Sequence, residues 1–194
     1  MSDKLYYDLT KFHKYTSELG IELSDEKISD FITFYEMLIE KNKVMNLTAI
    51  TDFDEVILKH FIDSLYLAKY FNLKKNMSVI DVGCGAGFPG IPLGIAFENL
   101  QVTLLDSLNK RISFLCYVKD VIGLENVFPL HGRAEEMAKN NFREKFDLCV
   151  SRAVSNISTL CEYCLPFVLK GGYFVSYKSG EYEEELQNGM KAID

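Results

Sequence analysis

Three features of the sequence could take part in chemistry, and each closes an apolar run. The first is a glycine-rich segment, Val79-Ile-Asp-Val-Gly-Cys-Gly-Ala-Gly-Phe-Pro-Gly90, and the others are Asp106 and Arg152. Glycines at a strand end let the backbone approach a ligand closely, and the N-terminus of a following helix favours negative charge. Asp106 lies 19 residues after Gly87, where a carboxylate can bind the two hydroxyls of a ribose. This spacing predicts a site for an adenosine-containing ligand.

Two kinds of cofactor fit this glycine segment. Gly85, Gly87 and Gly90 satisfy the G-x-G-x-x-G pattern of dinucleotide sites. However, Asp81 lies two residues before Gly83, where it would repel a pyrophosphate. S-adenosylmethionine has no phosphate, and a buried acid could pair with its ammonium group. The pattern D-x-G-x-G-x-G resembles motif I of the class I methyltransferases. We favour S-adenosylmethionine and keep a dinucleotide, or a structural turn without ligand, as alternatives.

The elements that would position these residues change in type near residue 77. Residues 1–77 show helical spacing, with Ser24 predicted to cap one helix and Thr51 with Asp54 predicted to form a capping box at the next. From residue 78, apolar runs at 79–82, 102–105, 127–130, 148–150 and 173–177 alternate with helices expected near 90–97, 108–122, 134–140, 156–168 and 181–192. This alternation predicts an α/β fold with a parallel sheet wound on both faces. The resemblance to class I methyltransferases implies the strand order 3-2-1-4-5. We expect an N-terminal helical cap (1–77) and a Rossmann-like core (78–194).

The end of the predicted sheet departs from the usual class I pattern. Such a sheet normally continues, after its fifth strand, into an antiparallel hairpin. Here one predicted helix fills the residues between that strand and Asp194. We therefore expect the hairpin to be missing and the edge of the fifth strand to be open.

Composition and charge narrow the classes of function. The chain has 194 residues, 48% of them hydrophobic, and a net charge of −7. The acidity lies in residues 1–77 and 179–194, and the neutral middle leaves a nucleic-acid partner open. The sequence shows no export signal and no apolar membrane-spanning stretch, and its five cysteines are an odd number, which indicates reduced thiols in the cytoplasm. Cys161-x-x-Cys164 lacks a second pair, so we expect buried thiols and no metal.

The segment that closes the fourth predicted strand bears on the methyl acceptor. It reads Phe146-Asp-Leu-Cys-Val-Ser-Arg-Ala-Val154, without the Asn/Asp-Pro-Pro-aromatic run of enzymes that methylate exocyclic amines. Cys149 lies inside the strand, which favours a core position over the nucleophile that a pyrimidine carbon-5 enzyme needs. Guanine N7 already offers a lone pair and needs no general base. The segment is therefore compatible with N7 chemistry.

Several motifs together resemble the bacterial RsmG (GidB) family. They are Asn46-Leu-Thr-Ala-Ile50, His60-Phe-Ile-Asp-Ser-Leu65, Asp81 to Gly90, Leu105-Asp-Ser-Leu-Asn-Lys-Arg111, Gly132-Arg-Ala-Glu135 and Ser151-Arg-Ala153. The resemblance implies methylation of N7 of guanine-527, in the 530 loop of 16S rRNA, in the small ribosomal subunit or its precursor. We expect the protein to be a monomer. It implies cofactor contacts from Asp81, Gly83, Cys84, Gly85, Gly87, Phe88, Asp106, Ser107, Ala134, Glu135 and Arg152, with Arg152 also beside the transferred methyl.

Four further residues are candidates for contact with the RNA substrate: Asn46, His60, Lys110 and Arg111. Each has a structural alternative, namely a turn for Asn46, a core position for His60, and solvated surface for Lys110 and Arg111. Two rival functions also stay open. One is a catalytically weak protein that binds cofactor and RNA, and the other is a dinucleotide-dependent oxidoreductase.

Overall fold

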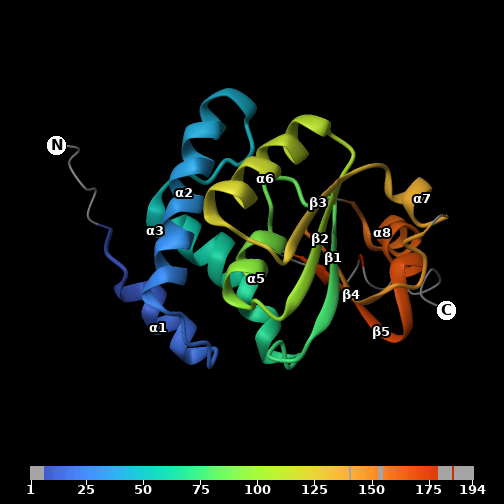
Figure 1. The fold of residues 1–194 in the computed structure, drawn as a ribbon, viewed down its shortest axis with the longest axis horizontal. Coiled ribbons are helices and arrows are strands. Elements are labelled where there is room, and N and C mark those ends of the chain that lie inside the picture. Colours follow the sequence, from blue (N-terminus) through green and yellow to red (C-terminus); the bar gives the residue numbers. More distant parts are fainter. Residues whose placement is uncertain (1–6, 140, 153–154, 179–184, 186–194) are drawn as a thin grey trace.

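A computed structural model describes residues 7–139, 141–152, 155–178 and 185. Five parallel strands form one sheet with helices on both faces (Figure 1). The strands are β1 (Met77–Val82), β2 (Leu100–Asp106), β3 (Val127–His131), β4 (Phe146–Arg152) and β5 (Val168–Tyr177), in the order β3-β2-β1-β4-β5. The predicted fold class and strand order are confirmed. Among the described residues, β5 pairs with β4 alone.

The topology of the sheet explains how candidate site residues from distant parts of the sequence come together. In a parallel sheet all carboxyl ends lie at one edge, and a ligand crevice opens where the strand order reverses. Here β1 lies between β2 and β4, so the reversal falls at β1 and β4. The residues that close β1, β2 and β4 are Val82, Asp106 and Arg152, and they meet at this edge.

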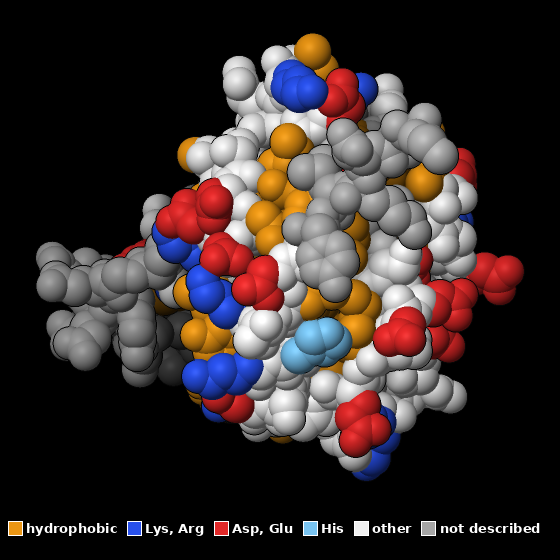
Figure 2. Space-filling model, turned by 90° about the vertical axis from the view of Figure 1, so that its left-hand side faces the viewer, with side chains coloured by type: hydrophobic (Ala, Val, Ile, Leu, Met, Phe, Trp, Pro, Cys, Tyr) orange, Lys and Arg blue, Asp and Glu red, His pale blue; other side chains and the backbone are white. Residues whose placement is uncertain are grey.

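The N-terminal cap is built from helices α1 (Thr10–Glu18), α2 (Asp25–Met45), α3 (Phe53–Val56) and α4 (Asp63–Leu65), the π-helical turn η1 (Ile57–Ile62) and the 3-10 turn η2 (Tyr66–Lys69). On the face that the cap presents, hydrophobic side chains gather centrally among interspersed acidic and basic ones (Figure 2). Ser24 accepts a hydrogen bond from the Lys27 backbone N–H, as predicted.

The predicted capping box at residues 51 and 54 is wrong. The helix begins one residue later, and Asp52 is its N-cap, with its carboxylate accepting the Glu55 N–H at 3.0 Å. An aspartate at the N-cap competes well against threonine because its negative charge also interacts favourably with the helix dipole.

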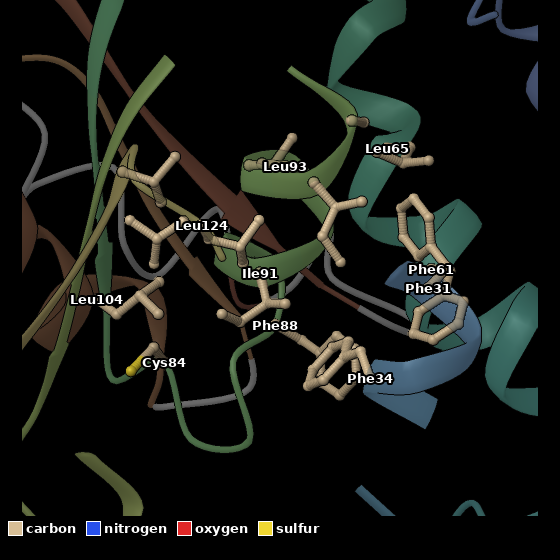
Figure 3. Packing of buried hydrophobic residues seen from close by; sticks show 14 of the residues in the cluster. Phe31, Phe34, Phe61, Leu65, Cys84, Phe88, Ile91, Leu93, Leu104 and Leu124 are labelled. Atoms are coloured by element: carbon tan, nitrogen blue, oxygen red, sulfur yellow. The ribbon is translucent and has the colours of Figure 1, made fainter. Parts of the chain in front are cut away.

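Packed aromatic rings join the cap to the glycine segment. Phe31 and Phe34 of α2 contact Phe61 of η1, and Phe34 and Phe61 in turn contact Phe88, with ring centroids 5.0 to 6.2 Å apart (Figure 3). All four rings belong to one buried cluster that continues through β1, β2 and β4. The cap is therefore packed directly against the element that would hold a ligand.

The remaining helices divide between the two faces of the sheet. Helices α5 (Gly90–Ala96) and α6 (Asn109–Ile122) lie on the cap side, and α7 (Ala134–Met137) and α8 (Ile157–Cys164) lie on the other (Figure 1). The helix expected over 156–168 is α8 followed by a 3-10 turn, η3 (Leu165–Phe167), because Pro166 cannot continue the α-helical hydrogen bonds. The helix expected near 181–192 lies, except for residue 185, outside the described residues.

Candidate active site

A cavity of about 450 Å³ opens at the carboxyl edge of the sheet. It is lined by Val82, Gly83, Gly85, Leu105, Asp106, Ser107, Arg111, Gly132, Arg133, Ala134, Glu135, Arg152 and Tyr163. These residues lie at the carboxyl ends of β1, β2 and β4, in the turns that follow β1, β2 and β3, or in α6, α7 and α8. The structure thus brings together seven of the predicted cofactor residues: Gly83, Gly85, Asp106, Ser107, Ala134, Glu135 and Arg152.

The glycine segment forms a tight turn between β1 and α5. The backbone N–H groups of Gly83 and Cys84 both donate to the Leu105 carbonyl, which ties the turn to β2. Position 87 requires glycine for two reasons. Its φ is 100°, and a Cβ there would lie 2.7 Å from Ile91 Cγ1 and 2.8 Å from Leu115 Cδ2. Cys84 is buried near Leu104 (Figure 3), so its side chain belongs to the core.

Asp106 is buried and accepts three hydrogen bonds. Its Oδ2 accepts from the Gly85 N–H at 3.0 Å and from Arg111 Nη1 at 3.1 Å, and its Oδ1 accepts from the Leu108 N–H at 2.8 Å. Arg111 lies in the first turn of α6, where the helix dipole disfavours a cation. The Asp106 carboxylate compensates for this position and holds the guanidinium at the cavity wall.

Asp81 lies behind the glycine turn and is completely buried. Its Oδ2 accepts the Gly90 N–H at 2.9 Å, while its Oδ1 has no partner among the described residues. Burial raises the pKa of this carboxyl group to about 7, although the Gly90 hydrogen bond and Arg152 favour its ionised form. Uncompensated buried carboxylate oxygens are costly, so this one suits a position where a cation binds.

Arg152 and His60 meet over the ring of Phe88. The Arg152 guanidinium carbon lies 4.9 Å from the Phe88 ring centroid, and the His60 ring stacks on Phe88 at 4.5 Å. Burial and the adjacent Arg152 lower the pKa of His60 to about 4, so the ring is neutral at neutral pH. Arg152 Nη2 lies 3.3 Å from His60 Nδ1, and a guanidinium can only donate. We therefore assign the ring proton to Nε2, which lies 2.8 Å from Thr48 Oγ1. The alternative tautomer would carry the proton on Nδ1, which lies 3.1 Å from the Lys59 carbonyl.

Other predicted site residues lie beside the cavity or away from its wall. Gly87 and Phe88 do not line the cavity. His60 does not line it either, but it contacts Phe88 and the cavity residue Arg152. Lys110 is exposed in the first turn of α6, beside Arg111. Asn46 ends α2 with a left-handed φ of 49°, so it is a turn residue in this structure.

Sequence reasoning did not single out Tyr163 or Arg133 as site residues. Tyr163 lines the cavity from α8, and its signal in the sequence was a position at the border of that helix's buried face. Arg133 also lines the cavity and pairs with Glu135 at 3.0 Å. Across the described residues, no group of three or more His, Cys, Asp or Glu could hold a metal ion, and no helix combines the length and hydropathy needed to cross a membrane.

Comparison with known proteins shows the family to which this chain belongs. The model of the family described as rRNA small subunit methyltransferase G matches residues 27–194. The chain belongs to this family. It is 50% identical over 188 residues to a ribosomal RNA small subunit methyltransferase G from Lachnoclostridium phytofermentans, covering 96% of this chain and 78% of that protein. A Staphylococcus saprophyticus protein of the same name is 51% identical over 174 residues, covering 90% and 73%.

Solved structures show the same fold at low sequence identity. A SAM-dependent O-methyltransferase from Thermotoga maritima aligns with a TM-score of 0.56 and 18% identity, over 80% of this chain and 54% of that one. An Aeropyrum pernix fibrillarin with natively bound S-adenosyl-L-methionine aligns with a TM-score of 0.50 and 14% identity, over 63% and 59%. Membership of the methyltransferase G family, together with this fold, favours rRNA methylation over the catalytically weak binding protein and the dinucleotide-dependent oxidoreductase.

Proposed function

We propose that this member of the methyltransferase G family transfers a methyl group from S-adenosylmethionine to N7 of guanine-527, in the 530 loop of 16S rRNA. The acceptor is the RNA of the small subunit or of its precursor. The observation that carries the choice of cofactor is the unpartnered Oδ1 of Asp81, buried behind the cavity wall. A cofactor ammonium would pair with this oxygen, whereas a pyrophosphate would be repelled by it.

The residues around the cavity fit the parts of S-adenosylmethionine. Asp106 would receive the ribose hydroxyls, and Ala134 with Glu135 would lie at the adenine. The turn at Gly83 and Gly85 leaves the backbone open to the methionine part, because no side chain stands between it and the cavity. When bound, this cofactor supplies a methyl group on a sulfonium, which N7 takes with its lone pair while the positive charge moves from sulfur to the base.

The protein's own task is then orientation rather than proton transfer. Guanine N7 carries no proton, so no general base is needed, and the lowered pKa of His60, about 4, makes this ring a weak base, in keeping with that requirement. Arg152 would lie beside the base and donate hydrogen bonds from its guanidinium, which is supported by the Phe88 ring 4.9 Å away. Lys110 is placed to contact an RNA phosphate next to the cavity, and Asn46 and Arg111 are further candidates for contact with RNA.

A genetic experiment tests the acceptor. In a strain without this gene, methylation at the single guanine should be lost, and the wild-type gene should restore it while an Arg152→Ala gene should not. Primer extension after borohydride and aniline treatment reports N7 methylation at single-nucleotide resolution. Unchanged rRNA in the deletion strain would reject the proposed acceptor.

A binding experiment tests the cofactor separately. Calorimetry on the purified chain should detect S-adenosylmethionine and its demethylated product and should detect no binding of NAD. Binding of NAD alone would favour the oxidoreductase instead. Cofactor binding without any turnover on unmethylated small subunits would favour the catalytically weak RNA-binding protein.

A further inference from the structure

The guanidinium of Arg152 is held almost entirely by the N-terminal cap. Nη1 donates to Asp63 Oδ2 at 3.0 Å and to the Lys59 carbonyl at 3.3 Å, and Nη2 faces His60 Nδ1 at 3.3 Å. All three partners lie in or next to η1, far along the chain from β4. The position of the guanidinium at the cavity is therefore set by a neighbouring segment and not by its own strand.

The π-helical turn arranges these partners. The Asp63 N–H bonds to the carbonyls of Leu58 and His60 instead of the Lys59 carbonyl that a regular α-helix would use. The Lys59 carbonyl accepts from Arg152 instead. Single π-helical turns inside α-helices are frequent at functional sites.

Asp63 differs from the other two partners in its charge. It is the one carboxylate that forms an ion pair with Arg152 in the part of the chain that the structure describes. The Arg152 side chain is only 16% exposed, so its charge is poorly solvated, while Asp63 is 46% exposed and reaches it from the solvent side. Removing the carboxylate would leave a largely buried guanidinium with neutral partners only, which favours movement of its end towards water.

We propose that Asp63 is a positioning residue, which fixes the Arg152 guanidinium over Phe88 and neutralises its charge at the methyl-transfer site. This inference rests on the proposed function, because that function places Arg152 beside the transferred methyl. An unpaired guanidinium there would repel the cationic sulfonium, and a paired one donates hydrogen bonds with much less net charge. The motif residue Asp63 thereby acquires a role that the cofactor site alone does not give it.

The test compares Asp63→Asn with a matched variant, Glu55→Gln, in the full chain. Glu55 pairs with Lys59 at 2.6 Å on the same helical run but does not contact Arg152. The first readout needs no cofactor: nitrogen NMR of the arginine side chains reports how fast the guanidinium of Arg152 rotates. We expect separate Nη signals in the wild type and in Glu55→Gln, and merged signals in Asp63→Asn.

The second readout is methyl transfer from tritiated S-adenosylmethionine to small subunits that lack the modification. We expect Asp63→Asn to lower kcat about tenfold or more while the cofactor Kd stays within about twofold, since a positioning contact is lost and the cofactor pocket is kept. In an Arg152→Ala background, Asp63→Asn should have no further effect, because both changes remove one interaction.

The outcomes separate this proposal from the proposed function. Separate Nη signals in Asp63→Asn, or kcat losses that simply add in the double variant, would overturn the role of Asp63. If the wild type transfers no methyl to the small subunit, the proposed function fails, and the NMR comparison still decides whether Asp63 holds Arg152.

Discussion

Arg111 Nη1 lies 3.1 Å from Asp106 Oδ2, so the carboxylate that would receive the ribose hydroxyls is already ion-paired from the cavity side. The side chain of Asp106 is 3% exposed and that of Arg111 is 38% exposed, so the arginine can move outwards while the acid cannot. A ribose that enters the cavity would share or displace this arginine. Arg111 is thus part of the cavity wall, in addition to being a candidate for contact with RNA.

Asp106→Asn should weaken the binding of S-adenosylmethionine. The amide keeps the size of the side chain but loses the charge and one acceptor. Because hydrogen bonds to charged groups are worth roughly 1.5–3 kcal/mol, we expect the Kd to rise on the order of 10- to 100-fold. Calorimetry measures this change. Asp120→Asn, on the exposed side of α6, is the control, and an equal loss of affinity in both variants would contradict the assignment.

Asp81→Asn should weaken cofactor binding and at the same time stabilise the protein at alkaline pH. Above about pH 7 the wild type carries a buried carboxylate with one unpartnered oxygen, and the amide removes this charge. We expect the free energy of unfolding to increase on the order of 1–3 kcal/mol there, measured by urea denaturation. Methylthioadenosine, which lacks the ammonium group, should bind the variant and the wild type equally. Equal losses for both ligands would place Asp81 away from the ammonium.

Sequence patterns predicted the strands and the place of the glycine turn and Asp106, because these depend on local periodicity or on where a parallel strand ends. The strand order and the cavity residues Ser107, Ala134, Glu135 and Arg152 were expected from the resemblance to known methyltransferases. Sequence patterns did not predict contacts between side chains of distant elements. Nothing local to Phe88 shows that it packs against the cap, and nothing near residue 63 shows an ion pair with Arg152. Asp52 was missed for a smaller reason: two adjacent residues could cap the same helix, and one-residue differences in a helix start are not encoded by periodicity.

Gly87→Ala should destabilise the fold more than alanine at another glycine with positive φ. At Gly87 the new Cβ would meet Ile91 and Leu115 at less than 3 Å, whereas at Gly123, with φ of 80°, nothing lies within 4 Å. Backbone strain alone costs about 1–2 kcal/mol, so Gly123→Ala should lose about that much. Overpacking adds about 1–3 kcal/mol for Gly87→Ala. Urea denaturation of both variants checks the difference, and equal losses would show that the turn can relax around a methyl group.

His60→Gln should change how stability depends on pH, in the direction opposite to Asp81→Asn. Between about pH 4 and its ordinary pKa of 6.5, His60 is neutral in the folded chain and protonated in the unfolded one, so its contribution to the free energy of unfolding rises with pH. Asp81 is protonated in the folded chain up to about pH 7 and ionised in the unfolded one above its ordinary pKa of 3.8, so its contribution falls with pH. The two slopes offset each other in the wild type.

In each variant, the free energy of unfolding should therefore show the pH dependence contributed by the residue that remains. Relative to the wild type, the free energy of unfolding of His60→Gln should fall as pH rises from about 4 to about 6.5, by at most about 1.4 kcal/mol per pH unit. That of Asp81→Asn should rise over about pH 4 to 7. Urea denaturation at several pH values measures both, with His13→Gln on the exposed side of α1 as the control. Parallel curves for His60→Gln and the wild type would mean that His60 titrates normally and that neither burial nor Arg152 lowers its pKa.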